Sequence, residues 1–596
     1  MNYNIRNNSK PSNMDAKNHN YASEISSPDL FTALCGFTSF VTNASSVLTV
    51  KRELRPVEVS VLASLLASGA QISHLVLEKE LPSGSATKLG PAIKSSTTTG
   101  TLRALTLGYL RQGNSVLAPE LFLTLAASVN PILEELSIHH IRTTDSCIRH
   151  VCNSLGQFAA LRSLAIYSPT PQMITEIGKL QTLESLRITR KEHDGLQTET
   201  LPATLTNLPL LTELKICKFQ ILAKTIQTIG GLVGLGRIRK LDLSEDYLDD
   251  EGVSAIVDAI VASQKIHSRP IELQELNLYC NIFCSKGEQA IAEKLQLPHL
   301  RVLNLSKNCI CDDFHKLRAV QSLEELNINL CGFDARKIQS VLDMSLPKLR
   351  VLKMDECSVG DIGAHAVARL LPASPLTELH MMCNSIREAG ALELAGAFAR
   401  TYTLKRLYMA DNSVTRRGAT AIIDALAAAF TMPMDMIDFS GCGIQDEGAK
   451  AMGRLISRRG CRSMCLYRSY IGAAGTKAIA DSIATSACSI QILNLSHNMI
   501  GDEGVEYLLN KITYPQNRSV QKLNIADNKM GVKGVMAAKR VVEAPGVLRK
   551  LKVGSCMGSK EACGALREVV MWERTSKSTE VAMIIRLGHE DINFSK

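Results

Sequence analysis

The segment LRVLNLSKN, residues 300–308, belongs to a pattern that recurs along this chain of 596 residues. The pattern is L-x-x-L-x-L-x-x-N, with cysteine in place of the last asparagine in some copies. Copies ending in asparagine are LQELNLYCN from Leu273, LKRLYMADN from Leu404, IQILNLSHN from Ile490 and VQKLNIADN from Val520. Copies ending in cysteine are LEELNINLC from Leu323, LRVLKMDEC from Leu349 and LRKLKVGSC from Leu548. Such self-similarity predicts a repeat architecture.

The spacing of the copies is nearly constant. The 17 intervals between residues 72 and 548 average 28 residues, and a degenerate copy near Ser45 contains Leu48 and Val50. The eighteen clear copies begin at residues 72, 102, 133, 161, 183, 211, 238, 273, 300, 323, 349, 376, 404, 434, 461, 490, 520 and 548.

Each copy predicts one strand and one helix. In L-x-L both leucines lie on the same face of a strand, and the residue between them points the other way. A glycine follows the turn in many copies, often after acids as in DEG at residues 446–448 and 502–504. Acids there favour the positive end of a helix. Apolar residues then recur three and four apart, as in GVEYLLNKI from Gly504. Such a unit is stable only when it is stacked on its neighbours, so the copies predict an α/β solenoid.

These repeats resemble leucine-rich repeats, and their length, the Asn/Cys turn and the helix after the glycine resemble the ribonuclease-inhibitor subclass. The resemblance covers roughly residues 45–575. It implies a horseshoe with a parallel β-sheet on the concave face and helices on the convex face. It also implies an intracellular protein that binds other proteins.

Four regions follow from this pattern. Residues 1–28 hold seven Asn and five Ser and predict a disordered tail. Residues 29–71 predict an N-terminal helical cap with the degenerate repeat. Residues 72–575 predict the solenoid of about 18 repeats, and residues 576–596 a C-terminal cap or tail.

The composition indicates which residues form the core and in which cellular compartment we expect the protein. The core must be aliphatic, because 45% of the residues are hydrophobic but only 4% are aromatic. Seventeen cysteines and a start without a secretory signal favour a reducing compartment, so we expect a cytoplasmic protein, with a nuclear or cytoskeletal place as alternatives. No apolar run is long enough to span a bilayer, which predicts no membrane association.

The search for chemistry yields no catalytic, cofactor or metal residues. Walker, H-E-x-x-H and G-x-S-x-G motifs are absent, so we expect no enzyme activity and no cofactor. Cys147, His150 and Cys152 lack the paired spacing of a zinc site, so we expect no metal either. The turn cysteines are expected to face inward as structural residues; they are Cys331, Cys357, Cys442 and Cys556.

The best functional candidates are the x positions of L-x-x-L-x-L-x, which face away from the core. Tyrosine is enriched among the residues that dominate binding energy. Charges of both signs are interspersed there until the last two repeats, which turn basic. The predicted partner-binding residues are Tyr167, Tyr279, Tyr408, Tyr467, Lys353, Asp355, His380 and Arg406.

The leading hypothesis is a non-enzymatic scaffold that binds a protein on the concave face. One alternative is a regulator of a small GTPase, because Ran GTPase activators resemble this repeat type. Here, however, the last 77 residues hold 14 basic and 8 acidic side chains, whereas those activators end in an acidic tail. Another alternative is that the protein is a cytoskeletal or axonemal subunit. The small aromatic content argues against nucleic acid as the partner.

Overall fold

A computed structural model shows the two compact units into which the chain divides, Met1–Ile282 and Phe283–Lys596. The described residues are 47–50, 56–68, 72–77, 85–98, 102–107, 133–139, 155, 158–190, 199–309, 321–332, 346–429, 433–484, 490–513, 519–543, 548–553, 582–584, 586–587 and 590–591. The tail predicted at residues 1–28 and the group Cys147, His150 and Cys152 lie outside them.

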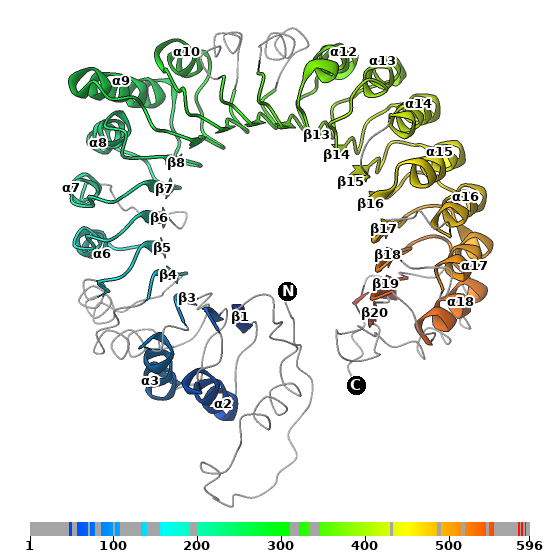
Figure 1. Ribbon diagram of the computed structural model, residues 1–596, viewed down its shortest axis with the longest axis horizontal. Coiled ribbons are helices and arrows are strands. Elements are labelled where there is room, and N and C mark those ends of the chain that lie inside the picture. Colours follow the sequence, from blue (N-terminus) through cyan, green and yellow to red (C-terminus); the bar gives the residue numbers. More distant parts are fainter. Residues whose placement is uncertain are drawn as a thin grey trace, which may run out of the picture. The chain divides into compact units, whose positions relative to one another are not determined.

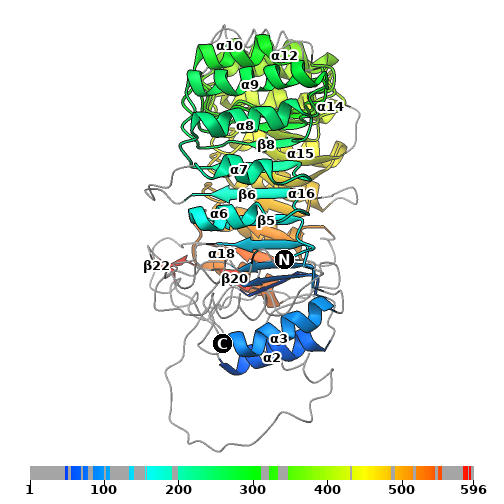
Figure 2. The same cartoon turned by 90° about the vertical axis from the view of Figure 1, so that its left-hand side faces the viewer.

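The first unit is built on a parallel sheet, with one helix after most of its strands. The strands are β1 (Val47–Val50), β2 (His74–Leu77), β3 (Ala104–Leu107), β4 (Glu135–Ile138), β5 (Ser163–Tyr167), β6 (Ser185–Thr189), β7 (Glu213–Cys217), β8 (Lys240–Asp242) and β9 (Glu275–Asn277). The helices are α2 (Pro56–Ala67), α3 (Ser85–Thr98), α6 (Pro171–Ile177), α7 (Leu201–Thr206), α8 (Ala223–Gly234) and α9 (Asp250–His267). Figure 2 shows α6, α7 and α8 side by side, one for each repeat.

The second unit repeats the same plan. Its strands are β10 (Val302–Asn304), β11 (Glu325–Asn327), β12 (Val351–Lys353), β13 (Glu378–His380), β14 (Arg406–Tyr408), β15 (Met434–Asp438), β16 (Cys461–Cys465), β17 (Ile492–Asn494), β18 (Lys522–Asn524), β19 (Lys550–Lys552) and β20 (Ala582–Ile584). A short antiparallel pair, β21 (Arg586–Leu587) and β22 (Glu590–Asp591), follows. The helices are α10 (Ser285–Lys294), α12 (Gly360–Leu370) with the 3₁₀ turn η2 (Leu371–Ala373), α13 (Glu388–Phe398), α14 (Thr415–Ala428), α15 (Gln445–Arg458), α16 (Ala473–Ile483), α17 (Gly501–Ile512) and α18 (Val532–Glu543).

The strands alternate as the L-x-L spacing predicts. Leu379 pairs in register with Leu407, and both are fully buried, while the residues on either side of them are partly or fully exposed. Within each unit the helices lie on one side of the sheet (Figure 1). The leucines therefore fill the layer between sheet and helices, which confirms the predicted α/β repeat solenoid. We call the other side, which carries the x residues, the sheet face.

Asparagines at the turn tie each repeat to the one before it. The Asn281 side-chain oxygen accepts backbone N–H bonds from Asp246 (3.1 Å) and Leu248 (3.0 Å), and its nitrogen donates to Leu243 O (2.9 Å) and Leu278 O (3.0 Å). One buried amide thus satisfies four backbone groups that would otherwise be costly to bury.

Cysteine fills the same position with a weaker donor. The thiols of Cys331, Cys357 and Cys442 are buried and contact carbonyl oxygens of the preceding repeat at 3.3, 3.0 and 3.0 Å. Burial raises their pKa to about 12, about 11 and about 12 respectively, so they stay protonated. The inward orientation predicted for them is confirmed, whereas Cys556 lies outside the described residues.

The acids before the repeat glycine act on the next repeat as well as on their own helix. Asp446, in the first turn of α15, accepts N–H bonds from Gly472 (2.7 Å) and Gly475 (3.0 Å), where α16 begins. A Cβ on Gly475 would lie 2.6 Å from the Asp446 oxygen, so the glycine allows this close approach. Asp361 caps the start of α13, and Asp502 that of α18, in the same way.

Candidate binding surface on the sheet

Five of the predicted binding residues come together on three adjacent strands of the second unit. Lys353, His380 and Tyr408 lie in register at the ends of β12, β13 and β14, and Arg406 lies two residues before Tyr408. Asp355 follows β12 by two residues. We call these residues, together with Glu325 and Glu378, the His380 cluster.

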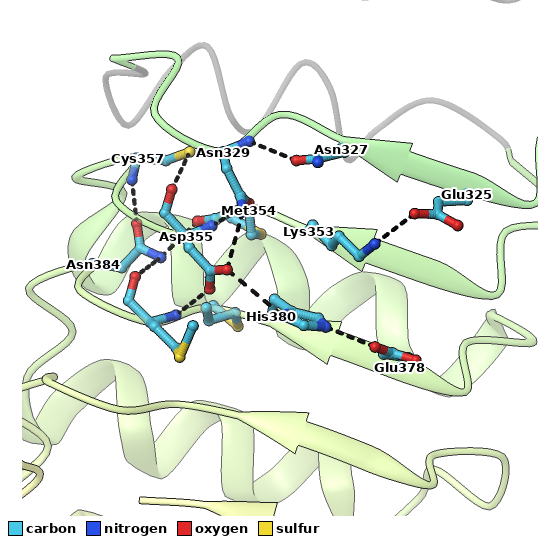
Figure 3. A network of polar contacts seen from close by, with 12 residues as sticks. Glu325, Asn327, Asn329, Lys353, Met354, Asp355, Cys357, Glu378, His380 and Asn384 are labelled. Carbon is cyan, nitrogen blue, oxygen red and sulfur yellow. Dashed lines mark hydrogen bonds and ion pairs between the residues drawn. The ribbon is translucent and has the colours of Figure 1, made fainter. Parts of the chain in front are cut away.

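His380 is the centre of the cluster. Its Nε2 lies 2.8 Å from Glu378 Oε1, and its Nδ1 lies 3.6 Å from Asp355 Oδ2 (Figure 3). Burial lowers the pKa of His380, but the contacts with the two carboxylates outweigh burial and raise it above the ordinary value. The ring also stacks on Tyr408, with centroids 4.1 Å apart. His380 is therefore fixed in position by acids at both nitrogens and by an aromatic face.

Asp355 is the buried residue that links the members of the cluster. Its residue exposure is 7%, the lowest among the five. Its carboxylate accepts the Met382 N–H (2.7 Å) and an amide hydrogen of Asn329 (3.1 Å), and the Asn329 side-chain oxygen accepts the Asp355 N–H (2.7 Å) (Figure 3). Asp355 therefore positions His380 and connects the repeats of β11, β12 and β13.

The cations of the cluster are already paired within it. Lys353 Nζ donates to Glu325 Oε1 at 2.6 Å, and Arg406 donates to Glu378 Oε2 at 2.7 Å. Arg406 also lies 3.7 Å from Asp435, and nearly half of its side chain is exposed. Partly exposed pairs of this kind contribute little to stability, but they order the side chains of the face.

The other three predicted residues are tyrosines outside this cluster. Tyr467, after β16, is exposed and meets the His497 ring edge-on at 4.9 Å. In the first unit, the ring of Tyr167 at the end of β5 lies 4.9 Å from that of His139, which follows the preceding strand β4, and half-buried Tyr279 follows β9. Three of the four tyrosines thus contact a histidine one repeat away.

Comparison with known proteins gives this architecture a name. A leucine-rich repeat family model matches residues 296–313, 437–453, 486–509 and 516–537. The ribonuclease inhibitor of Sus scrofa is 22% identical over 419 residues, 68% of this chain and 84% of the inhibitor. That of Mus musculus is 24% identical over 344 residues, 55% of this chain and 67% of the inhibitor. The chain is a leucine-rich repeat protein similar to ribonuclease inhibitors.

Two further likenesses accompany these. The NACHT, LRR and PYD domains-containing protein 14 of Mus musculus is 22% identical over 342 residues, which are 56% of this chain and 31% of that protein. A solved leucine-rich repeat protein of Leptospira interrogans has a TM-score of 0.37 and 16% identity, covering 70% of this chain and 90% of that one.

Sequence reasoning missed two residues of this leucine-rich repeat protein that matter to the site. Glu378 occupies an x position two residues before His380, so the same rule could have found it. Asn329 follows β11 and offers no sequence signal, because its role depends on the neighbouring repeat bringing Asp355 to it.

The described residues contain no group of three or more His, Cys, Asp or Glu side chains placed to hold a metal ion. Within the same part of the chain, every helix is too short or too polar to cross a bilayer.

Proposed function

We propose that this leucine-rich repeat protein is a non-enzymatic scaffold that binds a partner protein on its sheet face, with the His380 cluster as a central contact. The observation that carries the proposal is the stack of His380 on Tyr408, held by Glu378 and Asp355. Its kinship with leucine-rich repeat proteins supports protein interaction as the general mode of action.

A stacked and hydrogen-bonded aromatic pair suits a binding anchor. Tyr408 remains partly exposed although its ring rests on His380. Ordering a free side chain on binding costs roughly 0.5–1.5 kcal/mol, so a side chain already held in place binds more tightly. Tyrosine adds a large apolar area with a hydroxyl at its end.

The charges around the stacked pair of His380 and Tyr408 contribute more to the specificity of binding than to its affinity. Glu325, Lys353, Glu378 and Arg406 surround the stack with both signs, and each is paired within the face. A partner must match this alternation, because like charges brought together across an interface oppose binding. The cluster therefore favours a protein surface with complementary charges.

Crosslinking in the native cell, with mass spectrometry of the captured proteins, tests the proposal. The triple variant Tyr279→Ala, Tyr408→Ala, Tyr467→Ala should capture the partner of the wild-type protein at least about tenfold less well, because anchor residues dominate interface energy. The control is Tyr402→Ala, since Tyr402 is 62% exposed but lies before β14 rather than on the sheet face.

Each outcome has a distinct meaning. Loss of capture in the triple variant, with the Tyr402 variant unchanged and both variants folded by circular dichroism, supports binding on the sheet face. Unaltered capture moves the partner to the loops or helices and contradicts the proposal. A captured small GTPase would select the regulator alternative, and axonemal proteins the cytoskeletal one. The cellular compartment of the crosslinked proteins would also test the expected cytoplasmic location.

A further inference from the structure

Cations lie on the sheet face at strands β16, β18 and β19, while β17 between them carries no charged side chain. Residues 461–465, 491–494, 521–524 and 549–552 make up these strands and the residues just before them, and they contain five Lys or Arg and no Asp or Glu. The five are Arg462, Lys522, Arg549, Lys550 and Lys552, which we call the cationic tract. All are exposed except Lys550, which is half-buried.

The register of the strands brings like charges together. Lys522 of β18 pairs with Lys550 of β19, and Asn524 pairs with Lys552. Leu523 lies on the opposite, buried face, so Lys522 and Lys550 project from the same side of neighbouring strands, about 4.8 Å apart. Like charges directly opposite each other in a sheet are unfavourable unless something neutralises them.

Many cations elsewhere on the sheet face are neutralised within the chain, although among the described residues the exposed Arg187 of β6 forms no ion pair. Lys215 donates to Asp242 at 2.6 Å, and Lys240 lies between Glu213 and Glu275 at 3.1 and 3.3 Å. The His380 cluster pairs its cations in the same way. Among the described residues, by contrast, no member of the cationic tract forms an ion pair or a side-chain hydrogen bond. The tract is therefore left for an external anion.

We propose that the cationic tract docks an extended, Asp- and Glu-rich segment of the partner protein. The inference rests on the proposed function, because it assigns part of the same face to that partner. Four strands about 4.8 Å apart span about 14 Å, the length of four or five extended residues. Several carboxylates of such a segment would reach the tract at once.

An acidic polypeptide fits the tract better than a nucleic acid does. Single-stranded nucleic acids are held by aromatic side chains that stack on bases in addition to cations. The residues that form the tract strands contain no aromatic side chain, and their neutral polar groups are amides and a hydroxyl, including Asn494 and Asn524. Carboxylates need only cations and hydrogen-bond donors, which the tract supplies.

Fluorescence anisotropy of the full-length protein with labelled octaglutamate tests this. The variant Lys522→Glu, Lys550→Glu, Lys552→Glu should bind octaglutamate at least about tenfold more weakly, because charge pairs are replaced by repulsion. The matched control is Lys224→Glu, Arg416→Glu, Lys533→Glu, which changes the net charge equally. These control residues are exposed in the first turns of α8, α14 and α18, where glutamate is favourable.

The expected result is weaker binding in the tract variant only, with unchanged melting in both. Equal weakening in the two variants would show a response to net charge and overturn the inference. Tighter binding of octathymidylate than of octaglutamate, lost in the same variant, would assign the tract to nucleic acid. No binding of octaglutamate to the wild-type protein, while partner capture still depends on Tyr408, would reject this inference and leave the proposed function standing.

Discussion

The imidazole ring of His380 stacks on the phenol ring of Tyr408, with centroids 4.1 Å apart and planes inclined by 23°. The two residues are 28 positions apart in the sequence but directly paired in neighbouring strands. This distance is one repeat, so the solenoid converts a spacing along the chain into a lateral contact. The same relationship brings Asp355 against His380 from the other side.

The His380 cluster makes stability depend on pH. The pKa of His380 is raised above the unfolded value of 6.5, so its stabilising contribution is complete below that value. The contribution is lost as pH rises through the folded pKa, while Glu378, whose pKa is lowered, and Arg406, whose pKa is raised, remain charged. Thermal unfolding of the wild-type protein should therefore shift to lower temperature as pH rises above the unfolded value of 6.5 and through the folded pKa of His380.

The variant His380→Gln isolates this effect, because it keeps a polar side chain but cannot titrate. Its melting temperature should change less over the same pH range. A pH profile identical to that of the wild-type protein would show that His380 does not carry the dependence.

Leu407 tests the repeat register. Leu407 is fully buried between Leu379 and Ile437 in the neighbouring strands. Leu407→Asp should destabilise the second unit by at least about 4 kcal/mol, because it buries an unpaired carboxylate. Urea unfolding would measure the loss. Lys405→Asp, at an exposed position two residues away, is the control and should melt nearly as the wild-type protein does.

Asp446 tests the link between helices. Asp446→Ala removes the acceptor of the Gly472 and Gly475 N–H groups and should cost about 1–2 kcal/mol. Asp446→Asn keeps an acceptor oxygen and should recover most of the loss. Glu447→Ala is the matched control, because Glu447 is exposed and contacts Lys450 of its own helix. Equal melting of all three variants would contradict the capping role.

Asp246 occupies the turn position that asparagine holds in other repeats. Its Oδ1 accepts the Phe219 N–H at 2.7 Å, whereas Oδ2 is buried without a hydrogen-bond partner. Burial raises the pKa of Asp246 well above its usual range, although the hydrogen bond from the Phe219 N–H lowers it. The nearby charges of Asp242 and Glu245 raise this pKa further, and that of Lys215 lowers it. Protonated Asp246 therefore stabilises the folded protein relative to ionised Asp246. This contribution to the free energy of unfolding is complete below the unfolded pKa and is lost as pH rises through the folded pKa.

Asp246→Asn should therefore stabilise the first unit, by about 1–3 kcal/mol at pH values above the folded pKa. The new amide could donate to backbone carbonyls as Asn281 does. The gain in melting temperature should grow with rising pH. A gain that does not vary with pH would mean that Asp246 does not titrate in the folded protein.

The sequence by itself determined the repeat and its faces. In a solenoid each position of a repeat contacts the equivalent position of the neighbouring repeat. The leucines of L-x-L are therefore predicted to be buried, and the x residues are predicted to lie on the sheet face. The inward turn cysteines follow from the same periodicity. The strand at each of the eighteen start positions could be placed without coordinates.

Tertiary structure alone decided which side chains on that face act together. The alignment of repeats determined that His380 meets Tyr408 and Asp355, that Lys522 meets Lys550 without an acid, and that Asp446 caps the helix after its own. These contacts depend on register and rotamer between separate strands and helices. A periodic pattern gives the face of each residue, but distances of a few ångströms are set only when neighbouring repeats pack.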